Sequence, residues 1–119
     1  MKKTVVLGAS PNPSRYSNRV VKRLLSNDFE AVPIGVRKGV IEGIDIITTT
    51  PFVRNVHTIT LYLNPERQKM YYDYILSLQP ERVIFNPGTE NPELMTLAKA
   101  NNIEVEVACT LVLLAVGEY

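Results

Sequence analysis

A chain of 119 residues, 45% hydrophobic and 21% charged, is long enough for one domain with its own core, and this composition argues against intrinsic disorder. The formal net charge of +1 gives no overall electrostatic reason to expect nucleic acid or a membrane surface as a partner. The one cysteine, Cys109, excludes an intramolecular disulfide and a zinc site built from cysteines. Because no apolar run is long enough for a signal peptide or a membrane span, we expect a single domain over residues 1–119 in the cytoplasm.

The first predicted elements are a strand, a helix and a second strand. The apolar run Thr4–Leu7 predicts a strand covered on both faces, and Gly8 lets the backbone turn at its end. Apolar residues then recur at helical spacing between about Ser17 and Asn27, with Ser17 as the N-cap. A second strand is predicted from about Glu30 to Ile34, ending at Gly35.

The middle of the chain begins with a turn-rich segment. It contains a short β segment near residues 44–48 and a single helical turn from Pro51 through Val56. A third strand is predicted at residues 57–63, followed by a helix over residues 66–78. The apolar side of that helix consists of Met70, Tyr71, Tyr74, Ile75 and Leu78. We expect the tyrosines at positions 71, 72 and 74 to pack against the sheet and a neighbouring subunit.

The last third of the chain continues the alternation of strands and helices. A strand over residues 82–85 precedes a helix over residues 92–100, with Asn91 as N-cap and Pro92 at its first position. Its inward residues are Leu94, Leu97 and Ala98. A fifth strand follows at residues 103–107, and the tail from Cys109 to Val116 is either a short helix or a packed apolar segment.

This order of elements predicts an α/β fold. The crossovers between strands are long enough for parallel pairing, so we expect a doubly wound, Rossmann-like, five-stranded parallel sheet in the order 3-2-1-4-5. Ligands of such sheets bind outside the carboxyl ends of the strands, where the strand order reverses. We place that point between the first and third strands in chain order.

The loops after the strands therefore supply the candidate ligand-binding residues, because they meet at this edge of the sheet. The helix after the first loop also presents free backbone N–H groups and a partial positive charge, which suit a phosphate group. The alternative is that these loops are ordinary surface connections. The candidates are Gly8, Ala9, Ser10, Gly35, Arg37, Lys38, Asn64, Pro65, Asn86, Pro87 and Gly88.

The nature of the expected nucleotide depends on the loop after the second strand. The Gly-x-Gly-x-x-Gly fingerprint of dinucleotide-binding enzymes is not met, since only Gly8 is present. Such enzymes also place an acidic residue near the second strand, whereas this chain has Arg37 and Lys38. Two cations favour an extra ribose phosphate, which NADP carries at the 2′ position and coenzyme A at the 3′ position. The alternative for these two residues is a solvated turn.

Two short motifs carry a resemblance to a known family: Gly8-Ala9-Ser10 after the first strand and Arg15-Tyr16-Ser17 at the start of the first helix. With them, the chain resembles the small stand-alone CoA-binding proteins, which are similar to the N-terminal domain of the succinyl-CoA synthetase α subunit. The resemblance extends over essentially the whole chain. It implies that Gly8, Ser10, Arg15 and Ser17 surround the pyrophosphate or adenosine end of CoA. Tyr16 then either covers the adenine or pins the loop as a core aromatic residue.

The sequence gives little support for catalysis, so we expect a binding protein more than an enzyme. The one histidine, His57, falls at the start of the third strand, away from the predicted crevice. Cys109 falls at the correct edge, but a lone cysteine is more commonly a small buried hydrophobic residue than a nucleophile. The carboxylates are scattered, and no metal-ligand spacing is found, so no metal is expected.

Three functions remain open at this stage. The first is binding of CoA or an acyl-CoA by a non-catalytic sensor, carrier or regulatory module. The second is an NADP-binding, oxidoreductase-like domain. The third is a protein-interaction subunit with a vestigial pocket, since the chain has Gly35-Val36 where the family usually has an Asn-Pro pair. The apolar tail 111–116 serves either core packing or self-association, which leaves a homodimer open.

Overall fold

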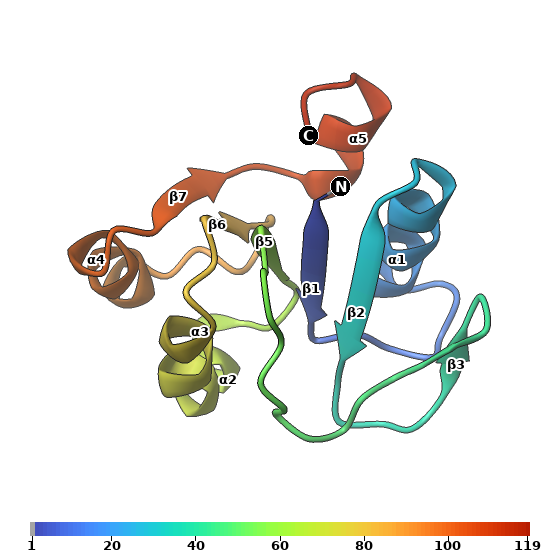
Figure 1. The fold of residues 1–119 in the computed structure, drawn as a ribbon, viewed down its shortest axis with the longest axis horizontal. Coiled ribbons are helices and arrows are strands. Elements are labelled where there is room, and N and C mark those ends of the chain that lie inside the picture. The colour runs from blue at the N-terminus through green and yellow to red at the C-terminus, as the bar shows by residue number, and fades with distance from the viewer. Residues whose placement is uncertain (1) are drawn as a thin grey trace.

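The centre of the structure is a parallel β-sheet with helices on both faces (Figure 1). The structure is a computed structural model, and it describes residues 2–119. Every pair of neighbouring strands in this sheet is parallel, so the predicted doubly wound α/β fold with a five-stranded parallel sheet is confirmed. In the order β2-β1-β5-β6-β7, the strands are β1 (Lys3–Leu7), β2 (Glu30–Ile34), β5 (Thr58–Leu61), β6 (Arg82–Phe85) and β7 (Glu104–Val107).

The position of one strand differs from the expected order. In the order 3-2-1-4-5 the third of these strands would lie outside β2, but β5 instead pairs with β1 on its other side. The place outside β2 is taken by Ile47, which forms an isolated parallel bridge with Ile34. The strand order therefore reverses between β1 and β5, so the switch point lies between the first and third of these strands, as expected.

The two faces of the sheet are covered by different sets of elements. On one face lie α1 (Tyr16–Ser26), α5 (Thr110–Ala115) and the antiparallel hairpin of β3 (Val40–Ile41) and β4 (Ile44–Asp45). On the other face lie α2 (Pro65–Gln68), the 3₁₀ turn η1 (Lys69–Tyr71), α3 (Tyr72–Leu78) and α4 (Pro92–Ala100). The apolar strands are thereby buried on both sides, as expected for a parallel sheet.

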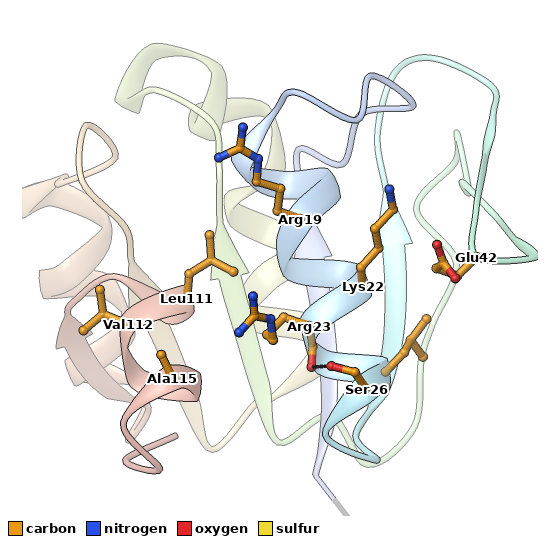
Figure 2. Close-up of a pocket in the computed structure, with 9 residues that line it drawn as sticks. Arg19, Lys22, Arg23, Ser26, Glu42, Leu111, Val112 and Ala115 are labelled. Carbon is orange, nitrogen blue, oxygen red and sulfur yellow. Dashed lines mark hydrogen bonds between the residues drawn. The ribbon is translucent and has the colours of Figure 1, made fainter.

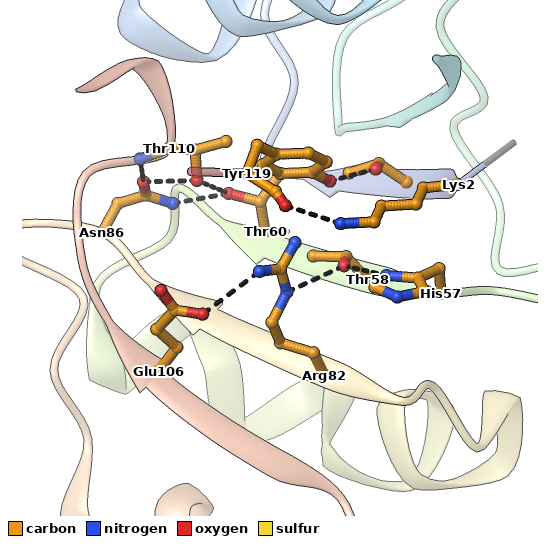
Figure 3. Close-up of polar contacts among 10 residues, drawn as sticks. Lys2, His57, Thr58, Thr60, Arg82, Asn86, Glu106, Thr110 and Tyr119 are labelled. Carbon is orange, nitrogen blue, oxygen red and sulfur yellow. Dashed lines mark hydrogen bonds and ion pairs between the residues drawn. The ribbon is translucent and has the colours of Figure 1, made fainter. Parts of the chain in front are cut away.

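Side chains alternate between the two faces along each strand, which creates two cores. Val5 and Leu7 of β1 join α3 and α4 in the first core, whereas Val6 joins α1 and α5 in the second. The second face is more polar, because Thr58, Thr60 and Arg82 point toward it and are almost fully buried. This polar layer lies beneath α5 and the C-terminal residue (Figure 3).

Several local predictions are wrong. Ser17 is not the N-cap of α1 but lies buried in its first turn, and the N-cap is Arg15. The helix expected over residues 66–78 is divided into α2, η1 and α3, and Met70 is 75% exposed rather than inward. Residues 51–56 form no helical turn.

Other local predictions are confirmed. Asn91 is the N-cap of α4 through a hydrogen bond that its side chain accepts from the backbone N–H of Leu94. The C-terminal tail forms the short helix α5. Within residues 2–119, every helix is too short or too polar to cross a membrane.

Candidate functional site

The loops after β1 and β2 pack backbone against backbone at the carboxyl edge of the sheet. The backbone N–H groups of Gly8 and Ala9 both donate to the carbonyl oxygen of Ile34, each over 2.9 Å. A Cβ atom at Gly35 would lie 2.2 Å from the carbonyl oxygen of Ala9, so only glycine fits there without displacing the first loop. The predicted site residues of these two loops are therefore brought together.

The loop after β1 is held in shape by its own polar side chains. The Ser10 hydroxyl oxygen accepts a hydrogen bond from the backbone N–H of Asn12, and the Asn12 side chain accepts one from the backbone N–H of Ser14. From α1, the buried Asn18 side chain donates to the carbonyl oxygen of Ser10 over 2.9 Å. The loop is thus organised before any ligand arrives, which lowers the entropy cost of binding.

The N-terminus of α1 is not capped by a protein side chain. Arg15, its N-cap, has extended backbone angles and a side chain that makes no capping hydrogen bond, whereas the side-chain oxygens of Asn64 and Asn91 cap the helices that they precede. The N–H of Asn18 already donates to the carbonyl oxygen of Arg15, so the N–H groups of Tyr16 and Ser17 and the positive end of the helix dipole remain for an acceptor from outside the chain. An anion is the chemical species that suits this position.

Several cations on the loops after β1 and β2 have no acidic partner. The ion pairs found among residues 2–119 are Lys3–Glu30, Lys69–Glu66 and Arg82–Glu106, so none of them involves Arg15, Arg37 or Lys38. All three of these side chains are exposed. Arg19, one turn along α1, lies over the ring of the exposed Tyr16, 5.4 Å from its centroid. The structure therefore places unpaired positive charge on both loops.

A buried glutamine positions the loops on the other side of the switch point. The side-chain NH₂ group of Gln68 donates to the carbonyl oxygens of Leu63 and Thr89, over 2.7 and 2.8 Å. Its side-chain oxygen accepts a hydrogen bond from Asn91. Our sequence analysis missed Gln68, although its position was a signal: it lies on the same helical stripe as Tyr71 and Ile75, so a polar side chain there needs buried partners.

Asn86 uses its side chain entirely within the protein (Figure 3). Its NH₂ group donates to the Thr60 hydroxyl oxygen and to the carbonyl oxygen of Leu61, and its side-chain oxygen accepts from the backbone N–H and the hydroxyl of Thr110. This predicted site residue joins β5, β6 and α5. The next two predicted residues, Pro87 and Gly88, are exposed at the same edge.

Asn64 and Pro65 lie at the carboxyl edge beyond β5. Asn64 caps α2, since its side-chain oxygen accepts from the backbone N–H of Arg67 over 2.9 Å, and Pro65 is the first residue of that helix. Both residues share the edge with the loops after β1 and β2, on the far side of the switch point. Whether they and the other candidates touch a ligand stays a prediction.

The side chains with chemical reactivity are divided between the two edges of the sheet. His57 lies at the start of β5, opposite the candidate site, where its Nδ1 atom shares a hydrogen bond with the Thr58 hydroxyl; burial lowers its pKa. Cys109 is half-buried and precedes α5. Nearby, burial raises the pKa of Tyr62 above its ordinary value, so this phenol stays protonated. Among residues 2–119, no group of His, Cys, Asp and Glu could hold a metal ion.

Comparisons with known proteins give one family, from a family model, and one fold, from solved structures. A family model described as "CoA binding domain" matches residues 2–115. A crystal structure described as an uncharacterized protein is 49% identical, with a TM-score of 0.98, and the match covers 100% of this chain and 98% of that one. A conserved hypothetical protein from Pyrococcus furiosus is 25% identical, with a TM-score of 0.79 and coverage of 90% and 93%.

A further structure shows the fold alone. It comes from Thermus thermophilus, is 21% identical, and has a TM-score of 0.85 with coverage of 99% of this chain and 90% of that one. The comparison with curated proteins finds no match.

Proposed function

The chain belongs to the family of CoA binding domains, and from this premise we propose that it binds coenzyme A or an acyl-CoA at the carboxyl edge of β1 and β2. We propose further that it does so as a non-catalytic sensor, carrier or regulatory module in the cytoplasm. The observation that carries this proposal is the N-terminus of α1, which lacks a side-chain cap, together with cations on the loops after β1 and β2 that have no ion-pair partner among residues 2–119.

CoA is a ligand whose charge suits this edge, because it carries a pyrophosphate and a separate 3′-phosphate. In the proposed complex, the pyrophosphate accepts hydrogen bonds from the first turn of α1 and from the guanidinium group of Arg15. The 3′-phosphate lies against Arg37 and Lys38 of the loop after β2, on the other side of the contact between this loop and the loop after β1. Tyr16, which is 64% exposed, is free to cover the adenine.

Binding without catalysis is supported by the position of His57 and by the hydrogen bonds of Asn86, while Cys109, which lies at the carboxyl edge, is half-buried. His57 lies at the amino edge of the sheet, so it cannot act on a ligand held at the carboxyl edge without a rearrangement of the fold. The Asn86 side chain, which lies at the correct edge, is fully hydrogen-bonded to the protein. The proposed role of the site is therefore recognition.

The proposal is tested by thermal unfolding and titration calorimetry with CoA, acetyl-CoA, NADP and NAD at about 1 mM each. A ligand that binds only the native state adds RT ln(1 + [L]/Kd) to the free energy of unfolding. This is about 2.7 kcal/mol at a hundredfold excess of ligand over Kd. We expect CoA or acetyl-CoA to raise the midpoint by several degrees and NAD to leave it unchanged. A shift with NADP alone would instead favour the oxidoreductase-like alternative, because its 2′-phosphate also suits the second loop. No shift with any ligand would favour a protein-interaction subunit with a vestigial pocket.

A further inference from the structure

A surface groove of about 920 Å³ runs between α1 and α5 (Figure 2). One wall is formed by Leu111, Val112 and Ala115 of α5, and the other by Arg19, Lys22 and Arg23 of α1. Its size falls within the range of roughly 300–1,000 Å³ that is usual for small-molecule sites. Neither the phosphate contacts nor the loop packing described above makes use of this groove.

The two walls have different chemistry. The α5 wall is aliphatic, and Val112 on it is 56% exposed. On the α1 wall, none of the three cations takes part in the ion pairs found among residues 2–119. Lys and Arg side chains of this kind present methylene stems to an apolar neighbour while their charged ends stay in water. Glu42 also lines the pocket, so one carboxylate faces the three cations and the lining keeps an excess of positive charge. The groove therefore suits a hydrocarbon chain attached to an anionic group.

The groove is continuous with the candidate site at one end. Both helices start at the carboxyl edge of the sheet, since α1 follows the loop after β1 and α5 follows β7. Arg19, which lines the groove, also stacks on Tyr16 of the first loop. Figure 2 shows Arg19 at the end of α1 that is next to this loop, with Arg23 and Ser26 farther along the helix.

We propose that this groove holds the acyl chain of a long-chain acyl-CoA, so that the ligand class is long-chain acyl thioesters rather than free CoA or acetyl-CoA. This inference rests on the proposed function, because the phosphates bound at the start of α1 fix the head of the ligand. The flexible pantetheine arm then crosses the mouth of the groove, and the chain lies between Val112 and the stems of Lys22 and Arg23. Burial of the exposed aliphatic wall supplies the added affinity.

The test is a calorimetric series of CoA, acetyl-CoA, octanoyl-CoA and dodecanoyl-CoA, each below its micelle concentration. We expect affinity to rise with chain length, by about tenfold or more from acetyl to dodecanoyl, since each fully buried methylene adds up to about 0.8 kcal/mol and an open groove buries only part of each. In Val112→Glu, dodecanoyl-CoA should bind no more tightly than acetyl-CoA, while CoA itself binds as in the parent protein. Val107→Glu is the matched control, because Val107 is 59% exposed but does not line the groove.

The outcomes separate the two proposals. If CoA does not bind, the proposed function fails and the inference fails with it. If CoA binds but affinity is independent of chain length, or rises equally in Val112→Glu, the chain does not lie in this groove and only the inference is overturned. Sedimentation of the unliganded protein tests the competing occupant, a second copy of the chain: a dimer that Val112→Glu dissociates would also overturn the inference.

Discussion

A Cβ atom at Gly35 would lie 2.2 Å from the carbonyl oxygen of Ala9, so the loops after β1 and β2 form one backbone surface at the edge of the sheet. The neighbouring atom is backbone and cannot rotate away, so any side chain at this position must push the first loop out of place. The shape of the proposed phosphate site thus depends on a contact between two residues that bear no polar side chain.

Gly35→Ala should destabilise the protein and weaken CoA binding together. Overpacking of this kind costs typically about 1–3 kcal/mol, and the displaced loop would no longer present its N–H groups correctly. Urea denaturation and calorimetry measure the two effects. Val36→Ala is the control for stability, because the Val36 side chain is 76% exposed. Unchanged stability in Gly35→Ala would show that the first loop adjusts freely.

Arg15→Gln should lower the affinity for CoA without changing stability. A charge-assisted hydrogen bond to phosphate contributes about 1.5–3 kcal/mol, which corresponds to roughly a 10- to 150-fold loss of affinity. Arg15 is exposed and makes no ion pair among residues 2–119, so the fold does not depend on it. Arg54→Gln, an exposed arginine outside both loops, is the control. Equal affinities for parent and Arg15→Gln would remove Arg15 from the site.

The double variant Arg37→Gln, Lys38→Gln should lose the preference for CoA over dephospho-CoA. The parent protein is expected to bind CoA more tightly, because only CoA carries the 3′-phosphate that these two cations attract. The ratio of the two dissociation constants, measured at low and high salt, reports this contact, since surface electrostatics weaken as salt rises. If the ratio stays the same in the variant, the second loop does not contact that phosphate.

Asn86→Ala should be among the most destabilising single substitutions at the site. It leaves the buried backbone N–H of Thr110 without its partner, removes a donor from the carbonyl oxygen of Leu61, and leaves the Thr60 and Thr110 hydroxyls bonded only to each other. Each unsatisfied buried group costs about 1–3 kcal/mol. Denaturant unfolding should show a loss of several kcal/mol. Asn101→Ala removes only an exposed side-chain hydrogen bond to Leu97 and should cost much less. Similar losses in both variants would contradict a central role for Asn86.

His57 should make stability depend on pH. Burial lowers its pKa from the ordinary 6.5, although the charge of Glu81 opposes this shift, so the folded state binds a proton less readily than the unfolded state. The resulting stability is fully present above pH 6.5 and is lost as pH falls through the lowered pKa of the folded state. The parent protein should therefore lose more stability than His57→Gln between pH 7.5 and 5.5. Parallel pH profiles for the two proteins would contradict this assignment.

The sequence by itself determined the elements that depend on near neighbours. The strand at Thr4–Leu7, the cap of α4 by Asn91 and the turn at Gly8 all follow from patterns within a few residues, because periodicity and capping are local. The switch point was also predictable, since the alternation of strands and helices leaves few topologies open. The expected ligand followed from the resemblance of two short motifs to a family, which the matched family model supports.

Only the tertiary structure decided which side chains meet across the chain. The pairing of β5 with β1, the hydrogen bonds of Gln68 to two loops and the commitment of Asn86 to Thr60 and Thr110 join residues that are distant in sequence. The groove between α1 and α5 likewise exists because helices from opposite ends of the chain pack on one face of the sheet. Such contacts leave no periodic signal, because their free energy comes from burial and hydrogen bonding that arise only when the whole sheet has formed.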